Sequence, residues 1–407
     1  MSLRLLILTQ YFPPEVGAPQ ARLSEQALRL RDLGVDVEVL TAMPSYPTGR
    51  IFDGWRGRWF AREQWRGLPV LRCAVYPTQS PRTLPRLLNY FSFVVSSAIV
   101  GVFLARRCDV VLVESPPLFL GLAGVLVAAS KRARMVLNVS DLWPETAVAL
   151  GVYDRRSLAV RLAVWLEKVL YRASSVVTGQ SDGIVRGVLD KHPGAQVVLV
   201  PGGVDCTTFA PARRDRARLS PLGCDGKFVV GYAGLIGVAQ GIGLLLDVAR
   251  RLAHRDDIVF VIAGDGPQRN ELEQRAGPNV VFAGLWPKAE MPALVASFDL
   301  ALIPLVATIP GALPSKMYEA MASEVPIVLA ADGDPRELLE RAGCGLAVPY
   351  GDADAVTAAV LHLCDDAPLA RSLGRAGRAY VLEHHRREAT AERLHAALQL
   401  ATAGTRA

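Results

Sequence analysis

The feature that most constrains the fold of this chain is an alternation of short apolar runs with helix-length segments. Runs such as "LRLLILT" (3–9), "VDVEVLT" (35–41) and "CDVVLVES" (108–115) are rich in leucine, isoleucine and valine, and helix-length segments such as 20–33 and 155–172 separate several of them. Strands that alternate with helices form βαβ units, in which the strands are parallel. Further strands are expected at 133–140, 174–181 and 195–203.

The same pattern restarts in the second half of the chain. Strands are expected there at 227–234, 258–266, 279–286, 299–305, 325–331 and 345–352. Residues 204–226 lie between the two series, and their Pro, Arg and Gly residues without apolar periodicity indicate a linker. Because 407 residues exceed one hydrophobic core, we expect an α/β protein with two doubly wound Rossmann-like domains that face a central cleft. The predicted domains are 1–205 and 206–386, with a last helix in 387–407 packing back on the first.

Positive charge is concentrated in one segment, 50–107. It holds ten arginines, no lysine and two acids, Asp53 and Glu63, so its charge of 10 − 2 = +8 exceeds the +6 of the whole chain. Aromatic residues such as Trp55 and Trp59 interleave with the arginines, which favours an anionic membrane surface as partner, although a solvated basic face stays open. No nucleic-acid-binding signature accompanies the arginines, so no nucleic-acid partner is expected.

One stretch within this segment, residues 87–107, has a long uncharged run. A spanning helix, a buried helix and a helix lying on a membrane surface all stay open for it. The N-terminus "MSLRLLILTQYFPP" reads as a first strand because its apolar run is too short for a signal peptide. The six scattered cysteines indicate reduced thiols. We therefore expect a cytoplasmic protein that is peripheral on the inner face of the cell membrane.

Glycines end three consecutive strands of the second half, in "GYAGLIGVAQGIG", "IAGDGP" and "FAGLW". In an open α/β sheet, ligands lie beyond the carboxyl ends of the strands, where glycine lets backbone N–H groups approach a phosphate. The segment "GALPSKMYEAMASEVPIVLA" follows and places Lys316 on the first turn of an expected helix. The free N–H groups at such a helix start would assist the lysine in binding a phosphate.

This ordered series resembles the retaining glycosyltransferases of family four, which have the GT-B fold, and the resemblance covers essentially the whole chain. "TQYFPPEVGAPQARLSEQALRLRDLGVDVEVLT" resembles the opening strand, glycine loop and helix of the family. "NVSDLWPETAVALG" resembles the subset that builds bacterial surface polysaccharides, including fucosamine-type aminosugar transferases. The resemblance implies transfer of a hexosyl or N-acetylaminosugar unit, with retention and without a metal or other cofactor. The implied donor is a nucleotide diphosphate sugar, UDP-linked, and the implied acceptor is lipid-linked or a polysaccharide.

The resemblance also assigns residues. Glu319 is expected to hold the donor ribose and Lys316 a phosphate, while Asp141 replaces a histidine that relatives direct at the donor sugar. These three are the predicted catalytic residues, although Asp141 could instead cap the helix that follows it. The predicted acceptor residues are Glu15, Trp143 and Glu145, with Glu15 as an alternative base. The predicted donor-binding residues are Gly17, Gly234, Gln240, Gly264, Gly266, Gly284, Leu285, Gly311, Ala312, Leu313, Pro314 and Ser315.

The chain departs from the family pattern at several positions. The family commonly has a glutamate where this chain has Gly311, an arginine and a lysine at Leu235 and Gln240, and in the related subset an arginine at Val238. The diphosphate is therefore expected to rest on Lys316, Gln240 and backbone amides. A non-catalytic partner that binds a nucleotide sugar or a membrane, and a nucleotide-sugar epimerase of the same architecture, stay open. The acidic triplets at 332–334 and 352–354 lie at a helix start and a turn, so no metal site is predicted.

Overall fold

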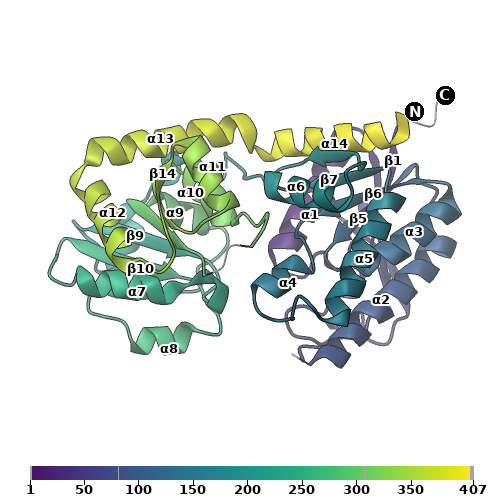
Figure 1. Ribbon diagram of the computed structural model, residues 1–407, viewed down its shortest axis with the longest axis horizontal. Helices are drawn as coiled ribbons and strands as arrows, with labels where there is room; N and C mark the ends of the chain where they lie inside the picture. The colour runs from purple at the N-terminus through teal and green to yellow at the C-terminus, as the bar shows by residue number, and fades with distance from the viewer. Residues whose placement is uncertain (1, 81, 307–308, 404–407) are drawn as a thin grey trace. The chain divides into compact units, whose positions relative to one another are not determined.

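A computed structural model describes residues 2–80, 82–306 and 309–403 of the chain (Figure 1). It divides into two compact units, Met1–Pro201 with Glu388–Ala407, and Gly202–Arg387. Each unit is built on one sheet with helices on both faces, as βαβ connections require. The predicted α/β class with two Rossmann-like units is confirmed.

The sheet of the first unit has the strand order β3-β4-β2-β1-β5-β6-β7-β8. All six strands predicted for this half are present, because strands buried on both faces read as continuous apolar runs. The hairpin of β3 and β4 was missed. It is the antiparallel edge of the sheet and turns at Arg66 and Gly67, both with positive φ. The strands are β1 (Arg4–Leu8), β2 (Asp36–Ala42), β3 (Phe60–Trp65), β4 (Leu68–Cys73), β5 (Val110–Ser115), β6 (Arg134–Val139), β7 (Val176–Gly179) and β8 (Val197–Leu199).

Helices cover both faces of this sheet. On one face α2 (Thr83–Leu104), α3 (Leu120–Lys131), α5 (Leu158–Ala173) and α6 (Asp182–Lys191) bury their apolar sides in a common core. On the other face lie α1 (Ala18–Asp32) and the last helix, α14 (Arg387–Ala403), through side chains such as Leu30 and Leu394. The short α4 (Glu145–Ala149) follows β6.

The sheet of the second unit is parallel throughout, with the order β11-β10-β9-β12-β13-β14. Its strands are β9 (Phe228–Ala233), β10 (Ile258–Ala263), β11 (Val280–Gly284), β12 (Leu300–Pro304), β13 (Ile327–Ala330) and β14 (Gly345–Val348). The helices are η3 (Val238–Gln240), α7 (Ile242–Arg251), α8 (Arg269–Gln274), α9 (Met291–Ala296), α10 (Ser315–Ala322), α11 (Asp334–Ala342), α12 (Ala353–Asp365) and α13 (Ala367–His384).

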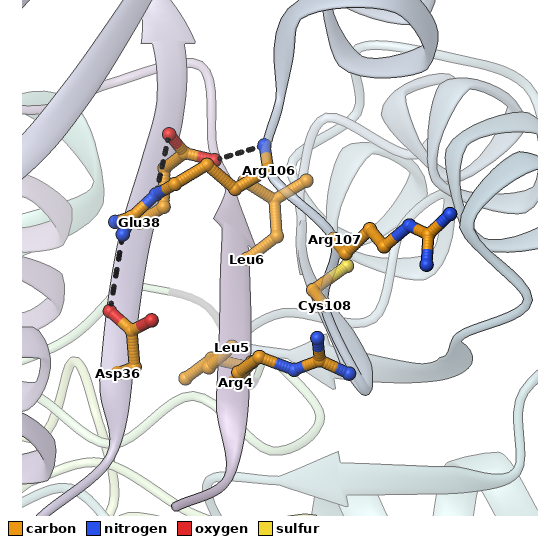
Figure 2. A pocket seen from close by; sticks show the side chains of 8 residues that line it. All are labelled: Arg4, Leu5, Leu6, Asp36, Glu38, Arg106, Arg107 and Cys108. Atoms are coloured by element: carbon orange, nitrogen blue, oxygen red, sulfur yellow. Dashed lines mark hydrogen bonds and ion pairs between the residues drawn. The ribbon is translucent and has the colours of Figure 1, made fainter.

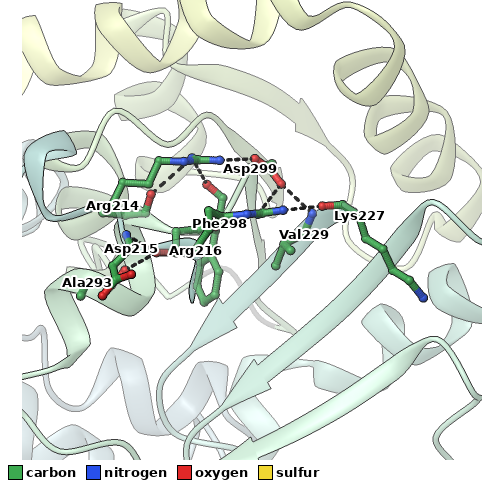
Figure 3. A network of polar contacts seen from close by, with 10 residues as sticks. Arg214, Asp215, Arg216, Lys227, Val229, Ala293, Phe298 and Asp299 are labelled. Atoms are coloured by element: carbon green, nitrogen blue, oxygen red, sulfur yellow. Dashed lines mark hydrogen bonds and ion pairs between the residues drawn. The ribbon is translucent and has the colours of Figure 1, made fainter. Parts of the chain in front are cut away.

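The predicted linker at 204–226 is wrong, because this segment packs on the second unit. It forms two 3-10 helices, η1 (Pro211–Arg213) and η2 (Arg216–Leu222). As Figure 3 shows, Arg214 and Arg216 converge on Asp299 at N–O distances of 2.6 and 2.8 Å, and the Asp299 carboxylate also accepts the amide of Val229 at 2.8 Å. Segment 204–226 has the composition of a linker, but these paired charges hold it on the second unit.

Candidate functional site

The site in the second unit begins where the strand order reverses. β9 lies between β10, the next strand along the chain, and β12. In a doubly wound sheet this reversal opens a crevice at the carboxyl ends of the two strands, where ligands bind. Helix α10, which carries Lys316 and Glu319, follows β12 at this edge. The two residues are one helical turn apart and therefore share a face of α10.

Lys316 reaches from α10 to the end of β9. Its Nζ donates to the hydroxyl of Tyr232 at 2.7 Å and lies 4.2 Å from the centre of that ring. Tyr232 in turn donates to the carbonyl oxygen of Leu235 at 2.7 Å. A Cβ at Gly234 would come within 3.3 Å of Lys316 Cε and Nζ, so the glycine leaves room for the lysine. Tyr232, which sequence reasoning missed, is the residue that orients this ammonium group.

Burial perturbs both charges of the pair. It lowers the pKa of Lys316 to about 8, against the opposing effect of Glu319. Burial also raises the pKa of Glu319, against the opposing charges of Lys316, Arg387 and Lys288. Within the described ranges, no side chain or amide donates a hydrogen bond to the Glu319 carboxylate. The carboxylate thus keeps its capacity to accept two hydroxyl groups.

The glycine loops after β9, β10 and β11 touch one another. The Gly234 amide donates to Ala263 O at 2.9 Å, and the Gly264 amide donates to Gly284 O at 2.8 Å. Both Gly234 and Gly264 have φ values, 149° and 139°, that side chains rarely adopt. A Cβ at Gly264 would overlap the carbonyl oxygen of Gly234, and one at Gly266 would overlap that of Ile236. These glycines therefore allow the strand-end loops to approach closely.

The loop before α10 has fewer free amides than predicted. The Gly311 amide donates to Asp334 Oδ2 at 2.6 Å, and the Ala312 amide donates to Ile309 O at 3.1 Å. Leu313 packs partly into the core. In the described part of the chain, the amides of Ser315 and Lys316 at the start of α10 have no acceptor. The amides available for an anion therefore belong to the helix start rather than to Gly311 and Ala312.

The other predicted donor residues lie along the same edge. Gln240 ends η3, and its side-chain oxygen lies beside Gly237. Leu285, after β11, is 73% exposed. Lys316, Glu319 and Tyr232 also line a cavity of about 20 Å³ together with Phe298, which is room for one water molecule rather than a nucleotide.

In the first unit, Asp141 follows β6 and accepts a hydrogen bond from the Thr146 hydroxyl. Burial raises the pKa of the Asp141 carboxyl, while the hydrogen bonds from Thr146 and from the Leu142 amide lower it. Pro144, not Asp141, is the residue that precedes the first turn of α4. The contact with Thr146 fixes the turn between β6 and α4, as a capping residue would.

Glu15, a predicted acceptor residue, is bound by backbone amides of the first unit. Its side chain is 4% exposed, and its oxygens accept the amides of Ser45 and Tyr46 at 2.8 Å and of Phe12 at 3.3 Å. This carboxylate therefore joins the loops after β1 and β2. Burial raises the pKa of Glu15, while the three amides and the charge of Arg72 lower it. The neighbouring Gly17 precedes α1, where a Cβ would overlap the side-chain oxygen of Gln20.

Glu145 also forms an internal pair. Lys191 donates to it at 2.8 Å and to Glu167 at 2.5 Å. Trp143 instead belongs to a row of aromatic rings. Its ring centre lies 6.4 Å from that of Phe119 and 6.3 Å from that of Tyr153. Of the predicted acceptor residues, Trp143 is thus the one whose contacts line an apolar wall.

Comparison with known proteins connects both units to one class of enzyme. A model described as "Glycosyl transferase 4-like domain" matches residues 17–203, and one described as "Glycosyl transferases group 1" matches residues 227–366. The chain is similar to the colanic acid biosynthesis glycosyl transferase WcaI of Escherichia coli K12, at 28% identity over 81% of this chain and 84% of the relative. It is also similar to a GDP-mannose-dependent alpha-mannosyltransferase of Mycolicibacterium smegmatis, at 29% identity over 89% and 88%.

Among solved structures, the chain is similar to HepE of Anabaena in complex with UDP and glucose. The TM-score is 0.71 at 18% identity, over 98% of this chain and 99% of that one. The two domain models together support a glycosyltransferase. Its fold is GT-B, as the resemblance implied.

The glycosyltransferase has a polar network that sequence reasoning missed. Glu114, Asn138 and Thr178 are neighbours in register on β5, β6 and β7. Asn138 donates to Glu114 at 2.5 Å and accepts from Thr178 at 2.7 Å, while Arg22 of α1 pairs with Glu114 at 2.5 Å. A polar residue near the end of each of three consecutive apolar runs was the signal that could have revealed it.

A second cavity of the glycosyltransferase lies at the opposite, amino edge of the first sheet (Figure 2). Figure 2 shows Arg106 reaching across it to Asp36 and Glu38, at 3.5 and 3.3 Å. Its volume of about 10 Å³ barely admits a water molecule. Both of its carboxylates are paired with Arg106, so the carboxyl edge remains the candidate site of this unit.

Proposed function

We propose that this glycosyltransferase moves a hexosyl or N-acetylaminosugar unit from a nucleotide diphosphate sugar to a lipid-linked or polysaccharide acceptor of the cell surface, with retention at the anomeric carbon. The observation that carries the proposal is the Lys316 and Glu319 pair at the strand reversal of the second unit. A carboxylate with free acceptor capacity suits the vicinal hydroxyls of a ribose, and an ammonium group beside free helix-start amides suits a diphosphate.

The names of similar proteins support the donor and the pathway class. HepE is described with UDP and glucose, the mycobacterial relative as GDP-mannose-dependent, and WcaI as an enzyme of colanic acid biosynthesis. We propose a UDP-linked donor for this chain, with GDP-linked sugars as the alternative that the same experiment tests.

The proposed reaction breaks the bond between the anomeric carbon and the β-phosphate oxygen and forms one between that carbon and an acceptor hydroxyl on the same face of the sugar. The hydroxyl proton passes to the departing β-phosphate oxygen, so the negative charge that develops on this oxygen as the bond breaks is neutralised when the protonated nucleoside diphosphate leaves. The ammonium group of Lys316 and the amides at the start of α10 stabilise that developing charge, since donors already in place need no reorganisation. No metal is required by this scheme.

The first unit is proposed to hold the acceptor at the carboxyl end of β6. Trp143 and the rings beside it would form the apolar wall, and the carboxylate of Asp141 would orient the sugar. A lipid-linked acceptor implies a peripheral position of the protein on the cytoplasmic face of the membrane. The sequence predicts segment 50–107 as the surface that contacts the membrane. Within that segment Arg72 is fully buried and pairs with Glu63, so part of its charge is structural.

The test is turnover with UDP- and GDP-linked sugars and a membrane extract as acceptor, with the anomeric configuration of the product read by NMR. Lys316→Ala should lose most turnover while the protein remains folded, and Lys227→Ala, at the amino end of β9, is the matched control. Unchanged turnover in Lys316→Ala would remove this lysine from the mechanism. Epimerisation of the donor in the absence of an acceptor would instead indicate a nucleotide-sugar epimerase.

A further inference from the structure

The outer surface of the first unit carries a continuous stripe of apolar side chains on α2. Its members recur every three or four residues, which places them on one side of the helix. They are Leu84, Leu88, Phe91, Val95, Ile99 and Phe103, and they are between 41% and 77% exposed. Exposed apolar side chains that are scattered singly need no explanation, but a stripe of this length does.

Two more helices extend this surface. α3 packs against α2 and also against α5, and Figure 1 shows the three helices on the same side of the unit. Leu126 on α3 is 57% exposed, and Leu158, Leu162 and Trp165 on α5 are 67%, 56% and 63% exposed. We call the exposed apolar side chains of α2, α3 and α5 the three-helix face. Its tryptophan is a residue type that concentrates where membrane meets water.

The charges around the three-helix face have one sign. The segments 82–107, 120–134 and 155–173, which contain the three helices, hold one acid, Glu167, and that acid is buried. The basic residues of these segments form a basic rim: Arg82, Arg86, Arg107, Lys131, Arg132, Arg134, Arg155, Arg156, Arg161, Lys168 and Arg172. Arg106 is paired with Asp36 and Glu38 and is not counted in this rim. A second copy docked through the same patch would bring this basic rim against itself. An anionic lipid surface would complement it.

Helix α2 passes the length and hydropathy test for a spanning helix, with a mean hydropathy of 2.0 over 18 residues, a third of which are buried. Its inner side, however, is bonded to the sheet and its loops. Asn89 donates to Tyr76 O and accepts from Gln10, both at 2.7 Å, and Ser96 donates to Ala74 O at 2.5 Å. Lys131 of α3 donates to the last carbonyls of α2. These bonds require α2 to lie along the unit with only its outer side available.

The face continues into the proposed acceptor wall. Phe91, a member of the α2 stripe, has its ring centre 4.7 Å from that of Phe119, which in turn contacts Trp143 beside the end of β6. An acceptor whose lipid stays in a bilayer could therefore present its polar head at the carboxyl edge of the first sheet.

We propose that the three-helix face is a docking surface that lies in the plane of an anionic bilayer, with the apolar side chains of α2, α3 and α5 in the acyl boundary and the basic rim at the headgroups. This proposal deepens the proposed function. It rests on that function in one respect only, which is that a lipid-linked acceptor is the reason for docking. Binding to lipid needs neither donor nor acceptor, so docking can be tested separately from catalysis.

The experiment is co-sedimentation of the full chain with vesicles of phosphatidylglycerol and phosphatidylcholine, and with vesicles of phosphatidylcholine alone. The wild type should bind the anionic vesicles, bind neutral ones less, and lose binding as salt is raised. Phe103→Ser with Trp165→Ala should weaken partitioning at least about tenfold, since each change removes a large apolar side chain from the lipid. The matched control is Leu33→Ser with Leu400→Ser, two exposed leucines on the opposite face of the sheet: Leu33 directly follows α1, and Leu400 lies in α14.

Circular dichroism and the thermal shift produced by a nucleotide sugar verify that each variant is folded and that the donor site is intact. The proposal is overturned if the wild type does not bind anionic vesicles, or if Phe103→Ser with Trp165→Ala binds as well as the wild type. If the wild type does not bind vesicles but forms dimers, and the double variant does not form dimers, the three-helix face is an interface with a second copy instead. Loss of vesicle binding with unchanged transfer to a water-soluble acceptor analogue supports docking and leaves the proposed reaction standing.

Discussion

Replacing Lys316 by methionine should strengthen the fold and abolish donor binding at the same time. Burial lowers the pKa of this lysine from 10.5 to about 8, which corresponds to a free-energy penalty of at most about 3 kcal/mol for keeping it charged in the folded protein. Its hydrogen bond to Tyr232 and its position over the ring offset roughly 1–2 kcal/mol of this. Lys316→Met should therefore raise the free energy of unfolding by about 1–2 kcal/mol at pH 7.

The pH dependence gives the sharper signature. Because the pKa of Lys316 is lower in the folded than in the unfolded protein, the unfolded state binds more protons between pH 8 and 10.5, and stability rises with pH in that window. The penalty is fully present below pH 8 and disappears toward pH 10.5. The stability advantage of Lys316→Met over the wild type should thus shrink as the pH rises from 7 to 10.

Donor affinity should move in the opposite direction over the same range. In the proposed function the ammonium form of Lys316 binds the diphosphate, so wild-type affinity should fall about tenfold per pH unit above pH 8. An intact nucleotide sugar is the right ligand, since its diphosphate does not titrate there. Thermal melts of both proteins from pH 7 to 10, with calorimetry of donor binding, measure the two trends. A donor affinity that is flat from pH 7 to 9 would refute the reasoning.

Three further changes test the rest of the second unit. Glu319→Gln should weaken nucleotide binding about tenfold by calorimetry, because a charged acceptor of the ribose hydroxyls becomes neutral. Gly264→Ala should destabilise the protein by about 2–4 kcal/mol in urea unfolding, since its Cβ would overlap Gly234 O, whereas Gly243→Ala, in open space within α7, should stabilise it by about 0.5–1 kcal/mol. Asp299→Ala should cost about 2–4 kcal/mol by leaving two arginines and an amide without their acceptor, seen as an equal loss of melting temperature with and without donor.

The strands were predictable and the edges were not, for a physical reason. Strands such as β5 and β12 are buried on both faces and read as apolar runs, so their positions follow from composition alone. The β3–β4 hairpin lies at the edge, where Arg62 and Gln64 face away from the core and interrupt the pattern. Segment 204–226 was read as a linker because its anchor, Asp299, lies more than 80 residues away in the sequence.

The candidate site divides in the same way. Lys316 and Glu319 were found together because their one-turn spacing is local. Tyr232, which orients the lysine, is 84 residues away and could not be paired with it from the sequence. Glu15 and Glu145 were predicted to face an acceptor, but they accept from amides and a lysine that the fold brings to them. A carboxylate near a strand end indicates the edge of the sheet, and its partners decide its role.

Gly311 shows how a departure from the family pattern can be built into the fold. A glutamate would be expected there by resemblance, yet the residue has φ near 79°, a conformation that disfavours any side chain. Its amide is held by Asp334 at the start of α11, so the loop before α10 is anchored through backbone rather than through an outward-pointing carboxylate. The charge that the family places at 311 has therefore not been replaced at the same point. We propose that the loops that follow β9 and β11 carry donor specificity instead.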